Sequence, residues 1–409
     1  MQTPWNCDYL TENNILDPWA SIAYISKNAQ YVQLCDERLE ETAETIFKKI
    51  ASGDFEEAFI RPAGLHVYNE VKLSLRNSLD RWCFACTMSF SFWSDYEKGM
   101  PRYIVKDREN RFWKGGRAIM VRLNHLIECG IAVSADAFEI MPFSVFNFFL
   151  MDRRAALPPM MEERYKAVIE VATVLNKKFH GSFYNCVTKA NNDPMKLMSL
   201  VLENFPSFRD IVDYNGKKVS FLMKAQLLVL GVSVLLEESK GVPVMDCSNF
   251  ILSTTNRDVQ MAIYYGGLVL SSGVENRVKD KDIFEYGEPA EVEMRAMTSK
   301  CMQLLADKIN SKLESSEKAL RIDYLDIDSI VDMDRVWNIA KLQRGQIIYP
   351  RTRCLENVQF VWQPEFFTPT SFGPNLVHHQ RVMITDEAVF GSAHSSATTN
   401  LTNDISCQV

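Results

Sequence analysis

Segments with apolar residues at helical spacing recur along most of this chain, and this pattern restricts the fold more than any other feature. In residues 36–50, charged residues separate the apolar side chains Leu39, Ala43, Ile46 and Ile50, which is the period of an amphipathic helix. Similar spacing predicts helices over residues 115–130, 160–179, 195–204, 218–238, 256–272 and 291–313. Few segments alternate with the period of two that half-buried strands show. The sequence therefore predicts a mainly α-helical protein with few short strands.

The positions of segments with the composition of a linker indicate where the folded part of the chain ends. No Gly/Ser-rich or Pro-rich linker divides the chain before about residue 355, so we expect residues 1–355 to form a single compact helical domain. From residue 386 the composition turns to Ser, Thr, Asn and His, which is typical of disordered segments. We therefore expect residues 356–409 to be a largely disordered C-terminal extension. The aromatic-rich residues 82–93 lack a helical period and are compatible with a buried strand or a fully buried helix.

Charge, apolar runs and cysteines restrict the partners and the compartment. The formal net charge is -7, whereas proteins that bind nucleic acid are usually basic because they neutralise phosphates. Nucleic acid is therefore not the expected ligand, but a mononucleotide needs only one or two cations. The start of the chain lacks the pattern of a secretory signal, and the apolar run of residues 225–236 is shorter than the roughly 20 residues that span a bilayer. The 10 cysteines include no zinc-type arrangement, so we expect reduced thiols, a cytoplasmic location and no membrane partner.

Four clusters of aromatic and charged residues stand out, since the sequence has no P-loop, zinc-protease or serine-hydrolase motif. They comprise residues 88–94, residues 205–210, residues 246–252 together with 256–260, and residues 291–295. The aromatic rings of the first cluster are compatible with a place in the core or with a platform that stacks on a base. The charges of the last, Glu291, Glu293 and Arg295, are compatible with a solvated face or a buried network. Spacing alone thus indicates a helical protein with an aromatic, mixed-charge pocket.

Taken together and in this order, the clusters resemble the family of queuosine 5′-phosphate N-glycosylases. Members of that family carry the segments LNFSFW, FPS(F/Y)RD, VSFYKRAQ, FADYRxPQ, EVEIR, DYYLWD and RIRC. The corresponding stretches here are residues 88–93, 205–210, 219–226, 253–260, 291–295, 323–328 and 351–354. The resemblance extends from about residue 12 to about residue 355, which is most of the chain.

The resemblance implies a helical fold similar to DNA glycosylases, and hydrolysis of queuosine 5′-monophosphate to queuine and ribose 5-phosphate. It implies no metal or organic cofactor. Cleavage of an N-glycosidic bond builds positive charge on the ribose ring, so a carboxylate must stabilise that charge or activate water. The leaving 7-deazaguanine cannot be protonated at N7, and hydrogen bonds to its polar edge must help it to leave. An aromatic wall stacks on the base, and a cation holds the phosphate.

Carried over position by position, the resemblance also implies a set of substrate-binding residues. These are His66, Phe90, Phe92, Trp93, Lys224, Thr254, Arg257, Gln260, Asp323 and Asp328.

This sequence departs from the family pattern at chemically important positions. The catalytic aspartate of the ADYR segment corresponds to Thr255, and the tyrosine after it to Asn256. An asparagine, a lysine and an aspartate elsewhere in the pattern correspond to Ser89, Met223 and Gly231.

Threonine carries no negative charge near neutral pH, so the departures leave alternatives open. In one, the protein is an active N-glycosidase with a relocated carboxylate, for which Asp258 is the candidate because it follows Thr255 by three residues in an expected helix. In another, it is a degenerate paralogue that keeps the fold and binds a different nucleotide or a protein partner. A third, a base-excision protein acting on nucleic acid, rests on fold analogy alone, and the acidic charge counts against it.

Overall fold

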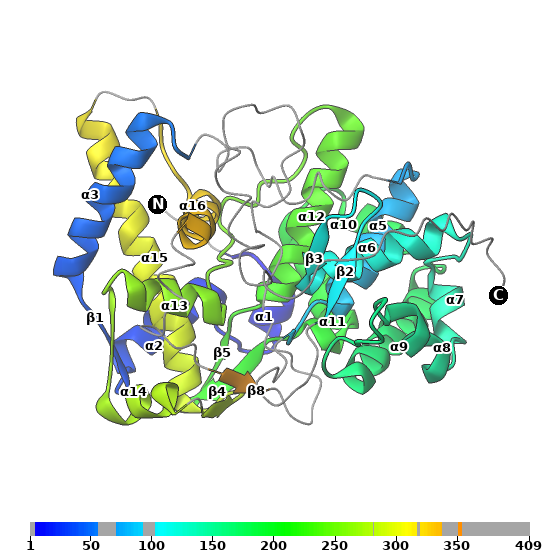
Figure 1. Ribbon diagram of the computed structural model, residues 1–409, viewed down its shortest axis with the longest axis horizontal. Coiled ribbons are helices and arrows are strands. Elements are labelled where there is room, and N and C mark those ends of the chain that lie inside the picture. Colours follow the sequence, from blue (N-terminus) through cyan, green and yellow to red (C-terminus); the bar gives the residue numbers. More distant parts are fainter. Residues whose placement is uncertain are drawn as a thin grey trace, which may run out of the picture.

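The computed structural model describes residues 5–55, 71–92, 103–280, 282–316, 320–337 and 351–353. Most of them lie in helices, and the strands of this described part form four two-stranded sheets (Figure 1). The prediction of a mainly helical fold with few short strands is confirmed. The expected likeness to DNA glycosylases stays a prediction, and the extension of residues 356–409 lies outside the described residues.

Helices occur along the whole described chain. They are α1 (Asp8–Glu12), α2 (Pro18–Asn28), α3 (Asp36–Ser52), α5 (Leu75–Met88), α6 (Gly115–Glu128), α7 (Ala135–Glu139), α8 (Phe143–Leu150), α9 (Met161–Lys178), α10 (Phe183–Ala190), α11 (Pro194–Asn204), α12 (Met223–Lys240), α13 (Asn256–Tyr264), α14 (Ser272–Lys279), α15 (Pro289–Ser315) and α16 (Tyr324–Trp337). A 3-10 turn, η3, covers Pro206–Phe208.

The sheets are small ribbons between helices. Three are antiparallel: β1 (Val32–Leu34) with β6 (Leu268–Leu270), β2 (Ile104–Lys106) with β3 (Phe112–Lys114), and β4 (Ile211–Tyr214) with β5 (Lys217–Ser220). The fourth pairs β7 (Ile283–Glu285) with β8 (Arg351–Arg353) in parallel.

The helical period of the sequence predicts most helices correctly, but it does not reveal two tight turns. Residues 218–220 belong to β5 rather than to the following helix, because Asn215 and Gly216, both with positive φ, form the tight turn of a β-hairpin. The helix expected over residues 256–272 ends at Tyr264. A Cβ on Gly267 would lie 2.6 Å from the Cys301 sulfur, so the chain turns closely against α15 before it enters β6.

The aromatic-rich segment is a helix for most of its length. Every residue from 78 to 88 of α5 is buried, and a helix surrounded by other elements needs no amphipathic period. Cys83 and Cys86 are therefore buried helical thiols, and not part of a strand-like run. Burial raises the pKa of both thiols well above the ordinary value.

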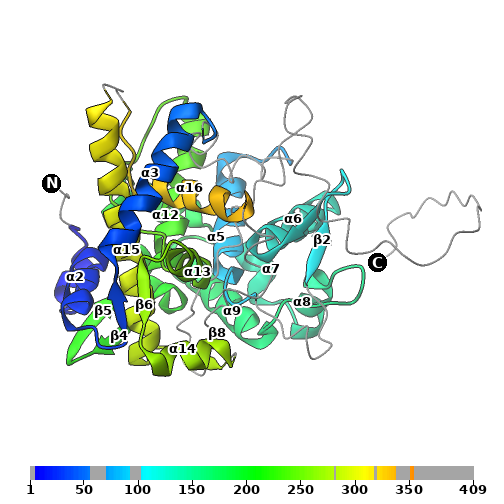
Figure 2. The ribbon, with the colours of Figure 1, turned by 60° about the vertical axis from the view of Figure 1, so that its left-hand side comes forward.

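Three apolar cores meet at the segment between α12 and α13. The first joins α5, α6 and α9 to α12, the second joins α3, α13, α15 and α16, and the third lies under α2, β4 and β5. Ile251 packs in the third core, Leu252 in the first and Val259 in the second. Figure 2 shows α13 between α15 on one side and α5 on the other. Residues 251–259 are thus held by all three cores.

Two properties of the described residues bear on the expected partners. No helix among them combines the length and the apolar character that a membrane crossing requires. Within the same residues, no group of three or more His, Cys, Asp or Glu side chains is placed to hold a metal ion.

Candidate functional site

The start of α13 is organised by a reciprocal pair of hydrogen bonds. Thr255 is the N-cap, and its Oγ1 accepts from the Asp258 backbone N–H at 3.4 Å. The Asp258 carboxylate turns back, and its Oδ2 accepts from the Thr255 N–H at 2.8 Å. This is a capping box, in which threonine and aspartate are both suitable N-caps. Thr255 thus keeps the structural role of an N-cap, while Asp258 brings a carboxylate back beside position 255.

A second carboxyl group is bound to the same segment from α16. The Ser253 hydroxyl donates to Asp328 Oδ1 at 2.9 Å. The Ser253 carbonyl accepts from the Ser299 hydroxyl of α15, also at 2.9 Å. Residues 253–258 are therefore fixed between α15 and α16, and the structure brings together Ser253, Thr255, Asp258 and Asp328 from the predicted segments.

Burial changes the protonation of these two carboxyl groups. Desolvation raises the pKa of Asp258 to about 6, with a further increase from the charge of Asp332, although hydrogen bonds from Thr255 and the charge of Arg257 lower it. Desolvation, followed by the charge of Asp258, raises the pKa of Asp328 well above its ordinary value. Two like charges in a buried space are unfavourable. Each carboxyl group of this pair is therefore harder to ionise than an exposed one, with the pKa of Asp258 raised to about 6 and that of Asp328 raised well above its ordinary value.

The aromatic segment after α5 is held by a buried arginine of α9. The Arg164 guanidinium donates to the carbonyls of Met88, Phe90 and Ser91. Its centre lies 4.3 Å from the Phe90 ring centroid and 4.5 Å from that of Phe92. Phe90 is fully buried and Phe92 is 8% exposed. These rings contact Arg164, while Trp93 and His66 lie outside the described residues.

Lys224 connects two of the family-like segments from within the first core. Its ammonium donates to the carbonyls of Thr87 and Ser207 at 3.0 Å each. It also lies 4.4 Å from the Phe208 ring centroid. Burial lowers the pKa of Lys224 to about 7. Lys224 thus ties the end of α5 to the turn η3.

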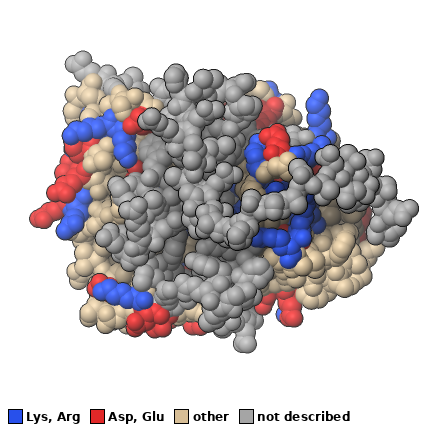
Figure 3. Space-filling view, in the orientation of Figure 1, with Lys and Arg blue, Asp and Glu red and all other residues tan. Residues whose placement is uncertain are grey.

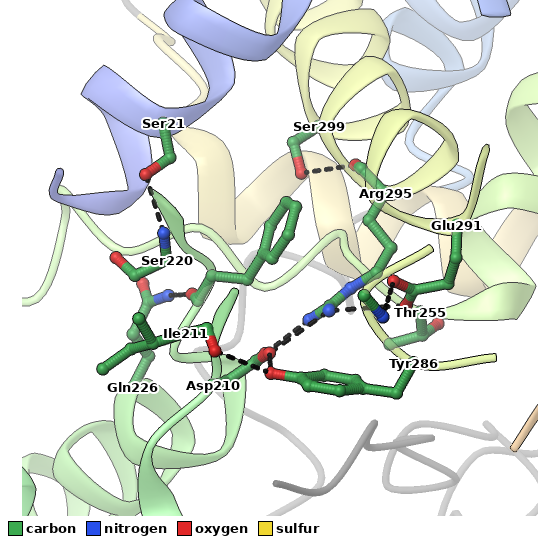
Figure 4. Close-up of polar contacts among 12 residues, drawn as sticks. Ser21, Asp210, Ile211, Ser220, Gln226, Thr255, Tyr286, Glu291, Arg295 and Ser299 are labelled. Atoms are coloured by element: carbon green, nitrogen blue, oxygen red, sulfur yellow. Dashed lines mark hydrogen bonds and ion pairs between the residues drawn. The ribbon is translucent and has the colours of Figure 1, made fainter. Parts of the chain in front are cut away.

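The charged cluster at the start of α15 is a buried network rather than a solvated face (Figure 4). Arg295 pairs with Asp210 and, at 3.4 Å, with Glu291. The Tyr286 hydroxyl donates to Asp210 at 3.0 Å. Burial raises the pKa of Glu291 to about 7, although the charge of Arg295 opposes this shift. The network joins α15 to the residue before β4.

Gln226 connects α12 to the chain segment that leads into Thr255. Its Oε1 accepts from the Ile251 N–H, and its Nε2 donates to the Phe221 carbonyl, each at 2.7 Å. Gln226 and Lys224 both lie on α12, so this helix carries contacts to the aromatic segment and to the chain that leads into Thr255.

The remaining predicted residues surround these groups. Thr254 and Gln260 are buried, and Arg257 is partly exposed on α13. Asp323 accepts from the N–H groups of Leu325 and Asp326 at 2.9 Å. It therefore organises the start of α16, the helix that carries Asp328.

Gly231 lies against an indole ring. A Cβ at this position would be 2.1 Å from the Trp82 side chain, far closer than two carbon atoms can approach. The Trp82 Nε1–H donates to the Leu228 carbonyl at 3.0 Å, which fixes the ring against α12. The space in which a side chain at position 231 would lie is thus filled.

Sequence reasoning missed Arg164, Ser299 and Gln226. For Arg164 the sequence did contain a signal, because it precedes Ala167, Val168 and Val171 on the buried face of α9. A charged residue in register with an apolar face indicates a buried role. The contacts of Ser299 and Gln226 join distant segments and leave no local pattern.

Comparison with known proteins gives consistent matches. A family model described as "Queuosine salvage protein" matches residues 71–355. A protein from Bos taurus is 27% identical over 349 residues, which cover 84% of this chain and 99% of the relative. One from Mus musculus is 27% identical over 348 residues, covering 83% and 98%. One from Sphaerobacter thermophilus is 25% identical over 271 residues, covering 66% and 78%. All three relatives are named queuosine 5′-phosphate N-glycosylase/hydrolase.

Proposed function

The chain belongs to the queuosine salvage protein family, and on that premise we propose that it hydrolyses queuosine 5′-monophosphate to queuine and ribose 5-phosphate. Water adds across the bond between ribose C1′ and the base nitrogen. The hydroxyl goes to C1′, and the proton goes to the leaving base. The substrate is a small-molecule nucleotide, and we place the reaction in the cytoplasm.

The capping box supplies a carboxylate although position 255 lacks the family's aspartate, and this observation carries the proposal. In the box, Asp258 Oδ2 is bonded to the Thr255 backbone N–H at 2.8 Å, so a carboxylate stays beside the family's catalytic position. We assign to ionised Asp258 the stabilisation of positive charge on the ribose. We assign to Asp328, whose pKa burial raises well above its ordinary value, a hydrogen bond to the substrate, which the carboxyl group donates when it is protonated.

The other substrate contacts follow the family pattern and support the same reaction. We assign base stacking to Phe90, Phe92 and Trp93, and phosphate binding to Arg257. Lys224 is buried and donates to the Thr87 and Ser207 carbonyls, so we assign to it the positioning of the aromatic segment. We assign to His66, Thr254, Gln260 and Asp323 further polar contacts with the nucleotide.

Incubation of the purified protein with queuosine 5′-monophosphate, with queuine detected by mass spectrometry, tests the reaction. We expect release above a blank without protein. Asp258→Asn should reduce the release by at least about a hundredfold, in line with the loss of a charge-stabilising group. Thr255→Ala should keep most of it. Asp280→Asn, at an exposed aspartate after α14, is the matched control and should equal the wild type.

The degenerate paralogue remains the alternative because Thr255 is uncharged and Trp82 fills the space at Gly231. It predicts no release by the wild type, together with release by the double variant Thr255→Asp, Asn256→Tyr. Equal queuine release by the wild type and by Asp258→Asn would show that the protein catalyses the reaction without a contribution from Asp258.

A further inference from the structure

The antiparallel ribbon of β2 and β3 has one face turned away from the core. Side chains alternate across a strand, so Val105 and Trp113 point inward and are buried, whereas Lys106, Phe112 and Lys114 point outward. Phe112 is 64% exposed, and it pairs directly with Lys106 across the ribbon. The Lys106 ammonium lies 4.5 Å from the Phe112 ring centroid. Two lysines and an exposed aromatic ring therefore share one small surface.

More cations lie on α6, which contacts the ribbon, and on the connection from α8 to α9. Desolvation and the charge of Arg122 lower the pKa of His125, the charge of Glu128 raises it, and the charges of Arg153 and Arg108 lower it further. Three guanidinium groups thus lie within electrostatic range of a single side chain. Figure 3 shows Lys and Arg side chains gathered on the right of the molecule, where β2, β3 and α6 lie in Figure 1. We call Lys106, Arg108, Phe112, Lys114, Arg122 and Arg153 the basic face.

Nearby carboxylates neutralise only part of this charge. Asp107 is buried and binds Arg111, and Asp152 is buried and binds Arg154. Glu128 pairs with Arg108 at 2.8 Å, and Glu109 pairs with Arg111 at 3.0 Å.

Three cations of the basic face remain without a carboxylate. Within the part of the chain that the structure describes, Lys106, Lys114 and Arg153 form no ion pair. The basic face is therefore locally positive on a chain whose net charge is -7.

We propose that the basic face binds single-stranded nucleic acid. Unpaired lysines and arginines attract phosphates, and an exposed ring among them offers a base a surface on which to stack. A duplex keeps its bases inside the stack and cannot use that ring, which favours the single strand. The acidic charge of the whole chain disfavours nucleic acid in general, so it makes this local contact weak and sensitive to salt.

This site is separate from the proposed hydrolysis. Its side chains lie on β2, β3, α6 and the connection from α8 to α9, whereas Asp258 and Asp328 lie on α13 and α16. Neither proposal depends on the other, and Asp258→Asn should leave binding at the basic face unchanged.

Fluorescence anisotropy with a labelled RNA oligonucleotide of mixed sequence, about a dozen nucleotides long, tests the proposal on the full chain. We expect binding at low salt that weakens as salt rises, with a log–log slope of about -2 for three neutralised phosphates. Lys106→Glu with Lys114→Glu should weaken binding at least about tenfold. Phe112→Ala should weaken it about fivefold and keep the salt slope, because stacking involves no counterion release.

The control is Lys27→Glu with Lys217→Glu, two exposed lysines on α2 and β5. Lys217 is a close match for Lys106, since its ammonium lies 4.6 Å from the Tyr24 ring centroid. No binding of the oligonucleotide at low salt would overturn the proposal. Equal losses of affinity in Lys106→Glu with Lys114→Glu and in the control double variant would also overturn it. Displacement of the oligonucleotide by phosphatidylserine vesicles, with no effect of Phe112→Ala, would assign the surface to anionic lipid and also overturn it. Circular dichroism and thermal unfolding establish that each variant is folded.

Discussion

At the scale of single residues, the position of one carboxylate has the largest consequences. Asp258 follows Thr255 by three residues, and its side chain accepts a hydrogen bond from the Thr255 N–H. Burial raises its pKa to about 6, so a charge near neutral pH is kept in an unfavourable place. A group that costs stability in its charged form, and that lies beside the position of the family's catalytic aspartate, is characteristic of functional sites.

The first prediction concerns the stability of Asp258→Asn. A carboxyl group whose pKa is higher in the folded than in the unfolded protein stabilises the fold at low pH, and that stability is lost as pH rises through the folded value, here about 6. Asparagine carries no charge. We therefore expect the free energy of unfolding of Asp258→Asn to exceed that of the wild type by about 3 kcal/mol at pH 8. Urea unfolding should show little difference at pH 4, and a variant less stable at pH 8 would contradict the assignment.

The second prediction concerns the pH dependence of hydrolysis. If ionised Asp258 stabilises the ribose cation, kcat/KM rises with pH through about 6. The charge of Asp332 raises the pKa of Asp258 and that of Arg257 lowers it. Asp332→Asn should therefore move the acidic limb to lower pH, and Arg257→Gln should move it to higher pH. Shifts in the same direction, or no shift, would exclude Asp258 as the titrating group.

At the scale of elements, the end of α5 depends on a side chain of α9. Arg164 donates to three carbonyls at and after the last residue of the helix, among them the Ser91 carbonyl at 3.2 Å. Ser91 has a positive φ of 43°, which non-glycine residues adopt at a cost. The guanidinium fixes this turn, and with it the aromatic segment that we assign to base stacking.

The third prediction is that Arg164→Lys loosens that segment. A lysine cannot present the planar fork of donors that spans several carbonyls, and buried carbonyls without partners cost stability. We expect a loss of about 3 kcal/mol in the free energy of unfolding. If the segment stacks on the base, KM should rise by a larger factor than kcat falls. Arg154→Lys, at a half-exposed ion pair with Asp152, is the control, and equal changes in KM and kcat would leave Arg164 a purely structural role.

At the scale of the whole molecule, residues 251–259 lie where three apolar cores meet. We propose that residues 1–355 unfold as one unit for this reason, since displacement of the segment exposes each core. The sheet of β7 and β8 closes this unit by pairing Ile283 with Arg351.

The fourth prediction distinguishes two truncations on either side of β8. A chain ending at residue 355 keeps the paired strand, and we expect a single thermal transition with the Tm and hydrolysis rate of the full chain. A chain ending at residue 350 loses the strand pairing of β7, and its Tm should fall by several degrees. Calorimetry measures both. Two separate transitions in the chain that ends at residue 355 would contradict a single cooperative unit.

How much the sequence revealed depends on whether a feature is local. The period of apolar residues located α3 closely, and the spacing of Thr255 and Asp258 was enough to expect them near the start of a helix. The Asn215–Gly216 turn was overlooked because the apolar residues on either side continue a helical spacing. The contacts of Arg164 with the end of α5, and of Trp82 with Gly231, join residues far apart in the chain. Such contacts depend on the tertiary fold, and no period or motif encodes them.

The indole of Trp82 against Gly231 restricts the order in which substitutions could restore the family pattern. With a Cβ at position 231 only 2.1 Å from that ring, Gly231→Asp in the present background would damage the packing of α12 before it could add any chemistry. A smaller residue at position 82 would have to come first, and alone it would leave a cavity of the kind that costs several kcal/mol. Each single step thus costs stability, which makes the change at position 231 difficult to reverse by one substitution at a time.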